Sequence, residues 1–276
     1  LIKNYLPTMN RSEIFLVMVS GMGTIAGSVM GTYIGMLGGT DPAAKVLFAT
    51  HLLSASVMAV PGSIVLAKML CPQTEEATDH VAISGKEKEN SNILDAISSG
   101  TVTGVKLMTN IAAMLLVFIS LVALANYITE GVIGRYTGLN DWIVKITDGK
   151  AQGLTFQFIL GVITSPFMWL IGVPSQDIML VGSLLGQKTI LNEFVAYFQL
   201  QQWKDAGLFM YEKSILMSTY ILCGFANISS IGILLGGLGV LAPEKRGLIS
   251  RIGLPAMIGG ALVSVLSATI IGMILG

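Results

Sequence analysis

Five stretches of this 276-residue chain run for 22 to 30 residues without an acidic or basic side chain. The hydrocarbon core of a bilayer is about 30 Å thick, and an α-helix of about 20 apolar residues crosses it. Each stretch is therefore predicted to be a transmembrane helix. The five stretches are Ile14–Gly39, Val46–Ala67, Leu107–Thr129, Ser214–Pro243 and Ile252–Gly276.

Composition supports lipid as the solvent of the chain. Only 12% of the residues are charged, whereas a soluble domain carries about 25%. The 16 basic and 16 acidic residues cancel, and no basic stripe with interleaved aromatic residues occurs, so nucleic-acid binding is not expected. Cys71 and Cys223 lie far apart and form neither a disulfide framework nor a metal-binding spacing. The sequence predicts an all-α, multi-pass membrane protein in a lipid bilayer. Basic residues on both kinds of loop leave its orientation open.

A re-entrant helical hairpin is predicted between the third and fourth runs. The apolar segment Thr155–Ile171 contains Pro166 and leads into the turn Gly172-Val173-Pro174-Ser175. The apolar segment that follows, Ile178–Gln187, has ten residues, which as a helix measure about 15 Å, half a membrane. Irregular backbone at this depth is tolerated only where protein buries it or where it lines a cavity. The alternative is one proline-kinked span followed by an interfacial helix.

Two polar segments connect the runs. Cys71–Ser91 is predicted to be an aqueous loop. Gly131–Lys150 is predicted to be a second connector, whose Trp142 favours an interfacial helix.

Two parts of the chain resemble each other and predict an internal repeat. One part begins at Leu1–Leu6 and contains the small-residue cluster Ala26–Gly31, and the other begins at Leu191–Tyr197 and contains Ala226–Gly232. One further span follows each part. Chance similarity between apolar segments is the alternative, but inverted repeats with broken helices are the architecture of secondary transporters.

The predicted organisation is a single transmembrane transporter domain over residues 1–276. Residues 1–70 form the remainder of the first repeat, 92–150 a central long helix with its connector, and 151–276 the second repeat with its hairpin. By this symmetry the first repeat should also own a hairpin before Leu1, so we expect the chain to be N-terminally incomplete.

The first polar cluster, Gln187 to Glu193, follows the short second arm of the hairpin. Polar groups inside a bilayer are costly and need a reason. A carboxylate such as that of Glu193 is an acceptor only and suits a ligand with paired hydroxyl groups. The alternatives are a salt bridge between Glu193 and Lys188, or a place at the membrane interface.

The second cluster, Phe225 to Ser230, lies in the middle of the 30-residue run. Asn227 and two serines, flanked by Gly224 and Gly232, favour an unwound helix whose free backbone groups can bind a ligand or an ion. The alternative is that Ser and Asn form hydrogen bonds between packed helices.

The third cluster, Ala26-Gly27-Ser28-Val29, is the repeat partner of the second. A hydroxyl and unwound carbonyl groups supply oxygen ligands that suit a hard cation such as sodium. Routine packing of small residues between helices is the alternative.

No catalytic constellation is visible, so the protein is not expected to be an enzyme. His51 and His80 have no acidic or cysteine partner at metal-binding spacing. His51 is expected to be a hydrogen-bonded helix residue. A nucleophile with a base is also lacking.

Several strings in these clusters resemble the concentrative nucleoside transporter family, and the resemblance covers the whole chain. The most specific are Asn192-Glu193-Phe194-Val195-Ala196-Tyr197 and Phe225-Ala226-Asn227-Ile228-Ser229-Ser230. Further matches are Gly172–Ser175, Gly186–Thr189, Ala26–Val29, His51–Met58 and the Pro243–Arg246 loop.

The resemblance implies a cation-coupled nucleoside symporter that works as a homotrimer by an elevator motion in a cell membrane, the inner membrane for a bacterial member. Glu193 would bind ribose hydroxyls with Asn227 and Ser230 beside it, Phe225 would pack near the ligand, and Gln187 is placed among the substrate-binding residues. Ser28 would lend its hydroxyl to sodium, with the backbone at Val29. A proton is the alternative coupling ion, and no other cofactor is expected.

Family members also carry a Gly-Gln-Thr-Glu string before the segment that matches Leu1. Because this string would contact the base and supply further sodium ligands, neither purine nor pyrimidine preference is predicted. Two alternative functions remain: a channel or transporter for another small polar solute, and a membrane subunit that transports nothing itself.

Overall fold

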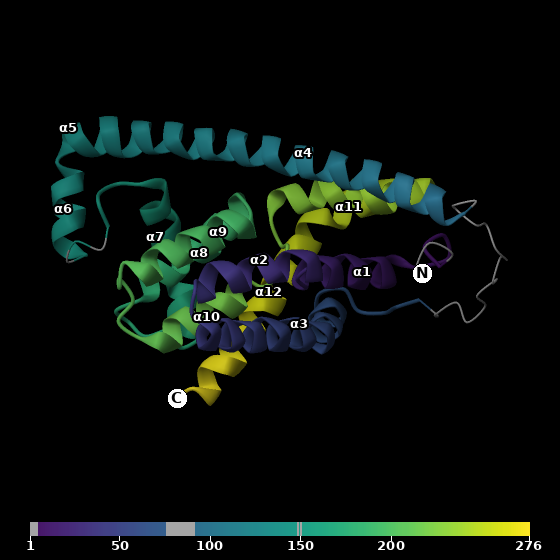
Figure 1. Ribbon diagram of the computed structural model, residues 1–276, viewed down its shortest axis with the longest axis horizontal. Helices are drawn as coiled ribbons and strands as arrows, with labels where there is room; N and C mark the ends of the chain where they lie inside the picture. The colour runs from purple at the N-terminus through teal and green to yellow at the C-terminus, as the bar shows by residue number, and fades with distance from the viewer. Residues whose placement is uncertain (1–4, 76–91, 148, 150) are drawn as a thin grey trace. The chain divides into compact units, whose positions relative to one another are not determined.

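The computed structural model describes residues 5–75, 92–147, 149 and 151–276, and all regular secondary structure in these ranges is helical (Figure 1). The chain forms two compact units. One comprises Leu1–Asp79 with Gln157–Gly276, and the other comprises His80–Phe156.

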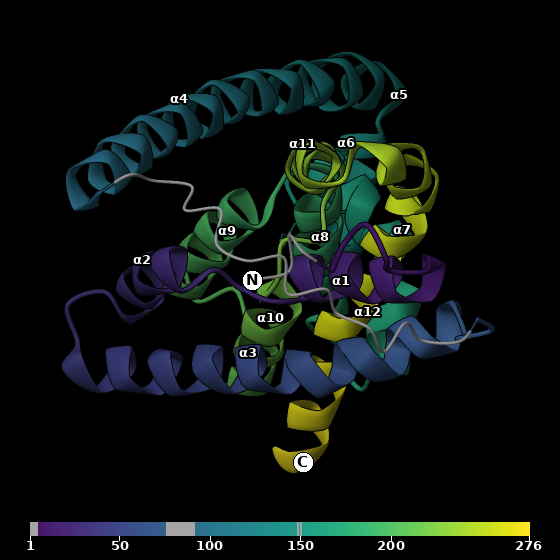
Figure 2. The same cartoon turned by 90° about the vertical axis from the view of Figure 1, so that its right-hand side faces the viewer.

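The first unit begins with a broken helix beside a long one. Helices α1 (Arg11–Gly23) and α2 (Gly27–Gly38) run alongside α3 (Pro42–Leu70), and Figures 1 and 2 show both lying along it. The predicted span Ile14–Gly39 is thus divided at residues 24–26, next to the cluster Ala26–Val29 where unwound carbonyl groups were expected. The break consists of Thr24, Ile25 and Ala26, and both Thr24 and Ala26 have extended backbone conformations.

The predicted hairpin is confirmed. Its arms α7 (Phe156–Leu170) and α8 (Ile178–Ile190) have 15 and 13 residues, which is about 20 Å of helix each, too short to cross a bilayer. The arms pack antiparallel through small residues, because a Cβ atom at Gly182 would lie 2.6 Å from Oγ1 of Thr164 and one at Gly186 2.6 Å from Cβ of Leu160. Gly172 turns the chain with a φ of 82°. The alternative of one kinked span with an interfacial helix is thus wrong.

The last part of this unit contains a second broken helix. After α9 (Glu193–Asp205), helices α10 (Glu212–Leu222) and α11 (Ile228–Leu241) divide the predicted run Ser214–Pro243 into pieces of 11 and 14 residues. The predicted unwinding of this run is confirmed. A 3₁₀ turn (Pro243–Lys245) then leads into α12 (Arg246–Ile274), against which both pieces pack.

The two broken helices share one pattern, in which two short helices precede one of 29 residues, α3 or α12. The breaks also meet in space. Gly224 has a φ of 146°, and a Cβ atom there would lie 2.9 Å from the carbonyl oxygen of Gly23, at the end of α1. The predicted inverted repeat therefore brings its two irregular segments together. Residues 1–4, which begin the first copy, lie outside the described residues.

Among the described residues, three stretches are long and apolar enough to cross a membrane. They are Arg11–Gly38, Pro42–Leu70 and Pro243–Ile274. The first unit thus combines long apolar helices with helices of half that length.

The second unit is built on the helix α4 (Ile93–Asn126), which continues as a π-helical segment (Tyr127–Gly134), α5 (Arg135–Thr137) and α6 (Leu139–Ile146). The predicted span Leu107–Thr129 falls within this continuous helical stretch, and most of the predicted connector Gly131–Lys150 is helical. The predicted loop Cys71–Ser91 lies mostly outside the described residues.

Candidate functional site

Glu193 and Asn227 meet inside the first unit. Nδ2 of Asn227 donates a hydrogen bond to Oε2 of Glu193 at 3.0 Å. Both side chains are buried, with exposed fractions of 7% for Glu193 and 2% for Asn227. The two predicted clusters, 34 residues apart in sequence, therefore form one polar site.

Helix capping fixes the orientation of the Asn227 amide. Its Oδ1 accepts from the backbone N–H of Ser230 at 2.9 Å, which makes Asn227 the N-cap of α11. The same oxygen accepts from the hydroxyl of Ser229 at 2.6 Å, and Oγ of Ser230 lies 3.0 Å from it. With Oδ1 engaged in this way, the Nδ2 group is turned toward Glu193.

Capping also holds Glu193 at the start of its helix. Asn192 is the N-cap of α9 and accepts from the N–H of Val195 at 2.9 Å. Glu193 is consequently the first residue of α9, where the positive end of the helix dipole favours a carboxylate. The N-caps Asn192 and Asn227 thus position the two side chains, Glu193 and Asn227, that form the hydrogen bond between α9 and α11.

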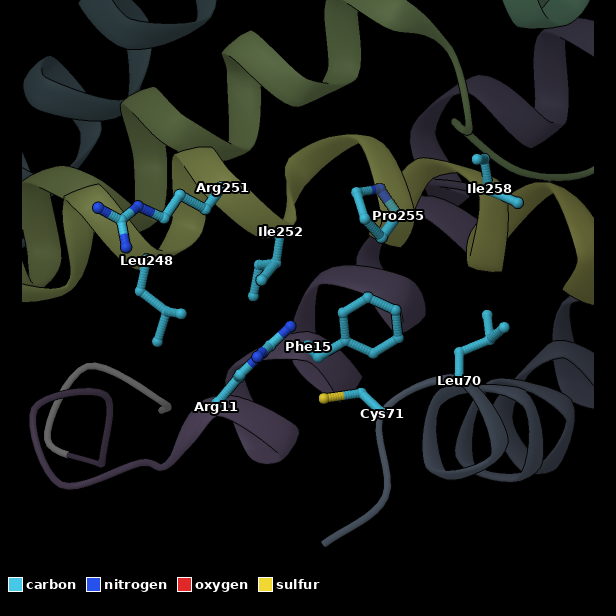
Figure 3. Close-up of a pocket in the computed structure, with 9 residues that line it drawn as sticks. All are labelled: Arg11, Phe15, Leu70, Cys71, Leu248, Arg251, Ile252, Pro255 and Ile258. Atoms are coloured by element: carbon cyan, nitrogen blue, oxygen red, sulfur yellow. The ribbon is translucent and has the colours of Figure 1, made fainter. Parts of the chain in front are cut away.

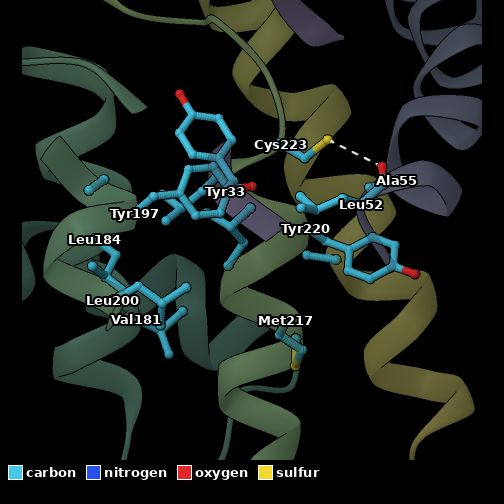
Figure 4. Packing of buried hydrophobic residues seen from close by; sticks show 14 of the residues in the cluster. Tyr33, Leu52, Ala55, Val181, Leu184, Tyr197, Leu200, Met217, Tyr220 and Cys223 are labelled. Atoms are coloured by element: carbon cyan, nitrogen blue, oxygen red, sulfur yellow. Dashed lines mark hydrogen bonds between the residues drawn. The ribbon is translucent and has the colours of Figure 1, made fainter. Parts of the chain in front are cut away.

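Tyr33 belongs to this site and was not among the predicted site residues. Its hydroxyl donates to Oε1 of Glu193 at 3.5 Å, a long hydrogen bond. The Tyr33 ring stacks on that of Tyr197 with centroids 4.1 Å apart, and Figure 4 shows the two rings together in the buried cluster. The hydroxyl of Tyr197 donates to the carbonyl of Thr219 at 2.8 Å. Tyr33 lies 160 residues from Glu193 in sequence, and no local pattern links them.

Lys188 does not form the alternative salt bridge with Glu193. Its ammonium group donates to the carbonyl oxygen of Ile221 at 2.7 Å and to Oγ of Ser264 at 3.0 Å. The side chain of Lys188 is fully buried, with an exposed fraction of 0%. Glu193 therefore keeps its carboxylate for Asn227 and Tyr33.

The other two predicted substrate residues stand apart from this contact. Gln187 is buried, and its Nε2 donates to Oγ of Ser183 on the same helix at 3.2 Å. Phe225 is half-buried, and its backbone carbonyl accepts from the hydroxyl of Ser230. The structure thus unites Glu193, Asn227 and Ser230, whereas Gln187 is held by its own helix.

The predicted sodium ligands lie at the first break. Ser28 is exposed in the first turn of α2, and the half-buried Val29 donates its N–H to the carbonyl of Ala26 at 3.1 Å. The carbonyl oxygens of Met22 and Gly23, at the end of α1, face Gly224. The end of α1 therefore places backbone oxygens close in sequence to a hydroxyl.

The expectation for His51 is confirmed, since its Nδ1 lies 3.1 Å from the hydroxyl oxygen of Tyr220. The described residues contain no group of three His, Cys, Asp or Glu side chains placed to hold a metal ion. His80 lies outside the described residues.

A groove of about 380 Å³ lies elsewhere in the unit, between the start of α1, the end of α3 and the start of α12 (Figure 3). Its residues are largely apolar, and the guanidinium groups of Arg11 and Arg251 border it. It contains none of the predicted site residues. The residues that line it are Arg11, Phe15, Leu70, Cys71, Leu248, Arg251, Ile252, Pro255 and Ile258.

A helical hairpin, two broken helices and a buried polar cluster where they meet are the architecture seen in inverted-repeat secondary transporters. Comparison with protein families agrees, because residues 51–272 match the family model described as "Na+ dependent nucleoside transporter C-terminus". The chain belongs to the concentrative nucleoside transporter family, as its motifs predicted, and corresponds to the C-terminal portion of that family.

Individual relatives of this family are similar to the chain along its whole length. The chain is 38% identical to an uncharacterized transporter of Haemophilus influenzae, with all of this chain aligned to 61% of that protein. It is 37% identical to the nucleoside permease NupC of Helicobacter pylori, again over its whole length and 60% of the relative. Rat sodium/nucleoside cotransporter 1 is 38% identical over 99% of this chain and 41% of its own length.

A solved structure of CNTnw in an inward-facing, substrate-bound state matches with a TM-score of 0.82 and 36% identity, covering 99% of this chain and 59% of that one. A CNTnw double variant in an outward-facing state matches with a TM-score of 0.83. The chain thus spans about three fifths of the length of these structures and of its bacterial relatives.

Proposed function

We propose that this protein is a cation-coupled nucleoside symporter that grips the ribose with Glu193. The observation that carries the proposal is the buried contact between the Glu193 carboxylate and the Asn227 amide at the second break. The proposal draws further support from relatives named as nucleoside permeases and sodium/nucleoside cotransporters.

The chemistry of the contact suits a ribose. An ionised carboxylate has about four acceptor positions, and Asn227 and Tyr33 use one on each oxygen of Glu193. The remaining positions can accept two neighbouring hydroxyl groups. A buried carboxylate favours such a donor pair because the two hydroxyl groups replace the hydrogen bonds that water would donate. Hydrogen bonds to a charged acceptor are also stronger than those between neutral groups. Ser230 and Phe225 lie at the same break, where a hydroxyl and an aromatic ring can complete the contacts, and we place Gln187 in the wider substrate site.

Sodium is the proposed coupling ion. Hydroxyl and carbonyl oxygens are the ligands that a hard cation prefers, and the first break provides the Ser28 hydroxyl, the backbone at Val29 and the carbonyl oxygens at the end of α1. The negative end of the α1 dipole favours a cation at the same place. These residues therefore fit a sodium ion, which would screen the converging helix ends while the nucleoside is bound.

Alternating access by an elevator motion of a homotrimer in the bacterial inner membrane completes the proposal. Its support is that CNTnw, the similar transporter, has been solved in outward-facing, intermediate and inward-facing states. Helices of half-membrane length that meet at the breaks would carry a bound solute as one body.

The test is uptake of radiolabelled uridine into proteoliposomes that contain the natural full-length protein, with and without an inward sodium gradient. We expect gradient-dependent accumulation, competition by other nucleosides, and no competition by free ribose or amino acids. In the Glu193→Gln variant the KM should rise by at least about tenfold, because hydrogen bonds to a charged group contribute about 1.5–3 kcal/mol each.

The matched control is Glu212→Gln, which neutralises an exposed glutamate in the first turn of α10. It should leave uptake unchanged. Unaltered uptake by Glu193→Gln would count against the binding role of Glu193. Accumulation that is independent of the sodium gradient would count against sodium coupling.

A further inference from the structure

A fully buried lysine lies beside the second break. Lys188, on α8, has an exposed fraction of 0%. A buried ammonium group is costly unless its protons find partners. Two of the described partners are Ile221 and Ser264, and Oγ of Ser264 in turn donates to the carbonyl of Cys223 at 2.9 Å. Lys188 thus links three helices at the break: α8, which carries it, and α10 and α12, which supply its partners.

The carbonyl groups at the end of α10 explain why a cation is needed there. The last carbonyls of a helix have no partner within the helix. Thr219 receives the hydroxyl of Tyr197, and Tyr220 receives the N–H of Cys223 at 3.1 Å. Ile221 receives the ammonium of Lys188. Lys188 is therefore a side-chain cap of the broken helix.

Electrostatics at the meeting point of the two breaks favour a positive charge. Gly224 lies against the carbonyl oxygens of Met22 and Gly23, with a Cβ atom there only 3.0 and 2.9 Å from them. The C-terminal ends of α1 and α10 therefore converge, and each carries a partial negative charge of about half an elementary charge. The Lys188 ammonium lies at one of these ends.

We propose that Lys188 is a tethered cation, which caps α10 and holds the sugar-binding residues Glu193 and Asn227 in register. At the second break its ammonium group takes the place that the proposed sodium ion would take at the first. Its role as a positioning residue for nucleoside binding rests on the proposed function, whereas its capping role does not.

The hydrogen bond between Lys188 and Ile221 lies close in sequence to both sugar-binding residues. Lys188 precedes Glu193 by five residues, and Ile221 precedes Asn227 by six. The ammonium thus links the segment 188–193 to the segment 221–227. Loss of this link would separate two groups whose hydrogen bond is 3.0 Å long.

The experiment compares Lys188→Met, Lys188→Gln and Lys188→Arg in the full-length protein. Methionine keeps the apolar stem, glutamine adds hydrogen bonding without charge, and arginine keeps the charge. We expect the nucleoside KM to rise by about tenfold or more in the first two variants, with a smaller change in maximal uptake, and Lys188→Arg to restore part of the affinity. A steric role alone predicts that methionine is as good as lysine.

The matched control is Lys204→Met. Lys204 also donates to a backbone carbonyl, that of Leu37 at 2.8 Å, but its side chain is 24% exposed and lies at the other end of α9. Uptake by this variant should equal that of the wild type. A KM for Lys188→Met within about twofold of the wild-type value would overturn the positioning role.

Hydrogen–deuterium exchange of the protein without nucleoside tests the capping role separately from transport. We expect faster exchange over residues 219–230 in Lys188→Met and not in Lys204→Met, because an uncapped helix end opens more often. Equal exchange would overturn the capping role. If the wild type fails to transport nucleosides, the proposed function fails while this measurement still decides the cap. If Lys188→Met does not fold, Ser264→Ala, which removes only the bridging hydroxyl, decides by the same two readouts.

Discussion

The Asn227 side chain makes two interactions, which replacement by serine or by alanine separates. Its Oδ1 caps α11 at Ser230, and its Nδ2 donates to Glu193. Serine is a good N-cap, so Asn227→Ser keeps the helix cap. The serine hydroxyl is too short to reach Glu193, so the hydrogen bond to the carboxylate is lost. Asn227→Ala loses both the cap and this hydrogen bond.

The magnitude follows from the kind of hydrogen bond. The donor faces a buried carboxylate at 3.0 Å, and such a bond contributes about 1.5–3 kcal/mol. Because this bond is present without ligand, Asn227→Ser should lose up to about 1.5–3 kcal/mol of stability. Its KM should rise as well, by about tenfold or more, because the amide no longer orients the Glu193 carboxylate. Asn227→Ala should show a similar KM and, in addition, lose about 1 kcal/mol of stability, the usual contribution of an N-cap.

The assay is uridine uptake in proteoliposomes together with thermal unfolding of the same preparations in detergent. Asn10→Ser is the control, because Asn10 caps α1 by accepting from the N–H of Glu13 at 3.0 Å and has no described contact with the site. It should leave the KM unchanged. Wild-type KM in Asn227→Ser, or equal stability of the serine and alanine variants, would refute this division of roles.

Two further changes probe the breaks. Gly224→Ala should sharply lower the yield and melting temperature of the protein, because φ is 146° and the new methyl group would lie 2.9 Å from the Gly23 carbonyl oxygen, whereas Gly232→Ala, with nothing within 4 Å, should be tolerated. A folded, fully active Gly224→Ala protein would contradict the close approach of the breaks. Ser28→Ala should raise the sodium concentration for half-maximal uptake several-fold by removing one oxygen ligand, with little change in the nucleoside KM at saturating sodium. Unchanged sodium dependence, measured by titrating the gradient, would remove Ser28 from the cation site.

The second break could be predicted from sequence because its signal is local. An asparagine between Gly224 and Gly232, in the middle of a run without charges, conflicts with an unbroken transmembrane helix. The hairpin could also be predicted, from the turn Gly172–Ser175 and from the ten-residue apolar arm that follows it. The first break gave a weaker signal, since Thr24 and Ala26 are residues that also occur inside unbroken transmembrane helices, and the hydrogen bond from Thr24 to Ser20 is one that any threonine in a helix can make.

Long-range partners could not be predicted. Tyr33 and Glu193 are 160 residues apart, and Lys188 meets Ser264 across 76 residues. Neighbouring charges in sequence suggested a pair between Lys188 and Glu193 instead. Only the hydrogen bonds of Lys188 to α10 and α12 show that the ammonium caps the carbonyl groups of a broken helix.

The most direct measurement compares uridine with 2′,3′-dideoxyuridine as ligands of the wild type and of Glu193→Gln. If the carboxylate accepts both ribose hydroxyls, the wild type should bind uridine at least about 100-fold more tightly than the dideoxy analogue, and the variant should lose most of that preference. The same preference in both proteins would contradict ribose recognition by Glu193.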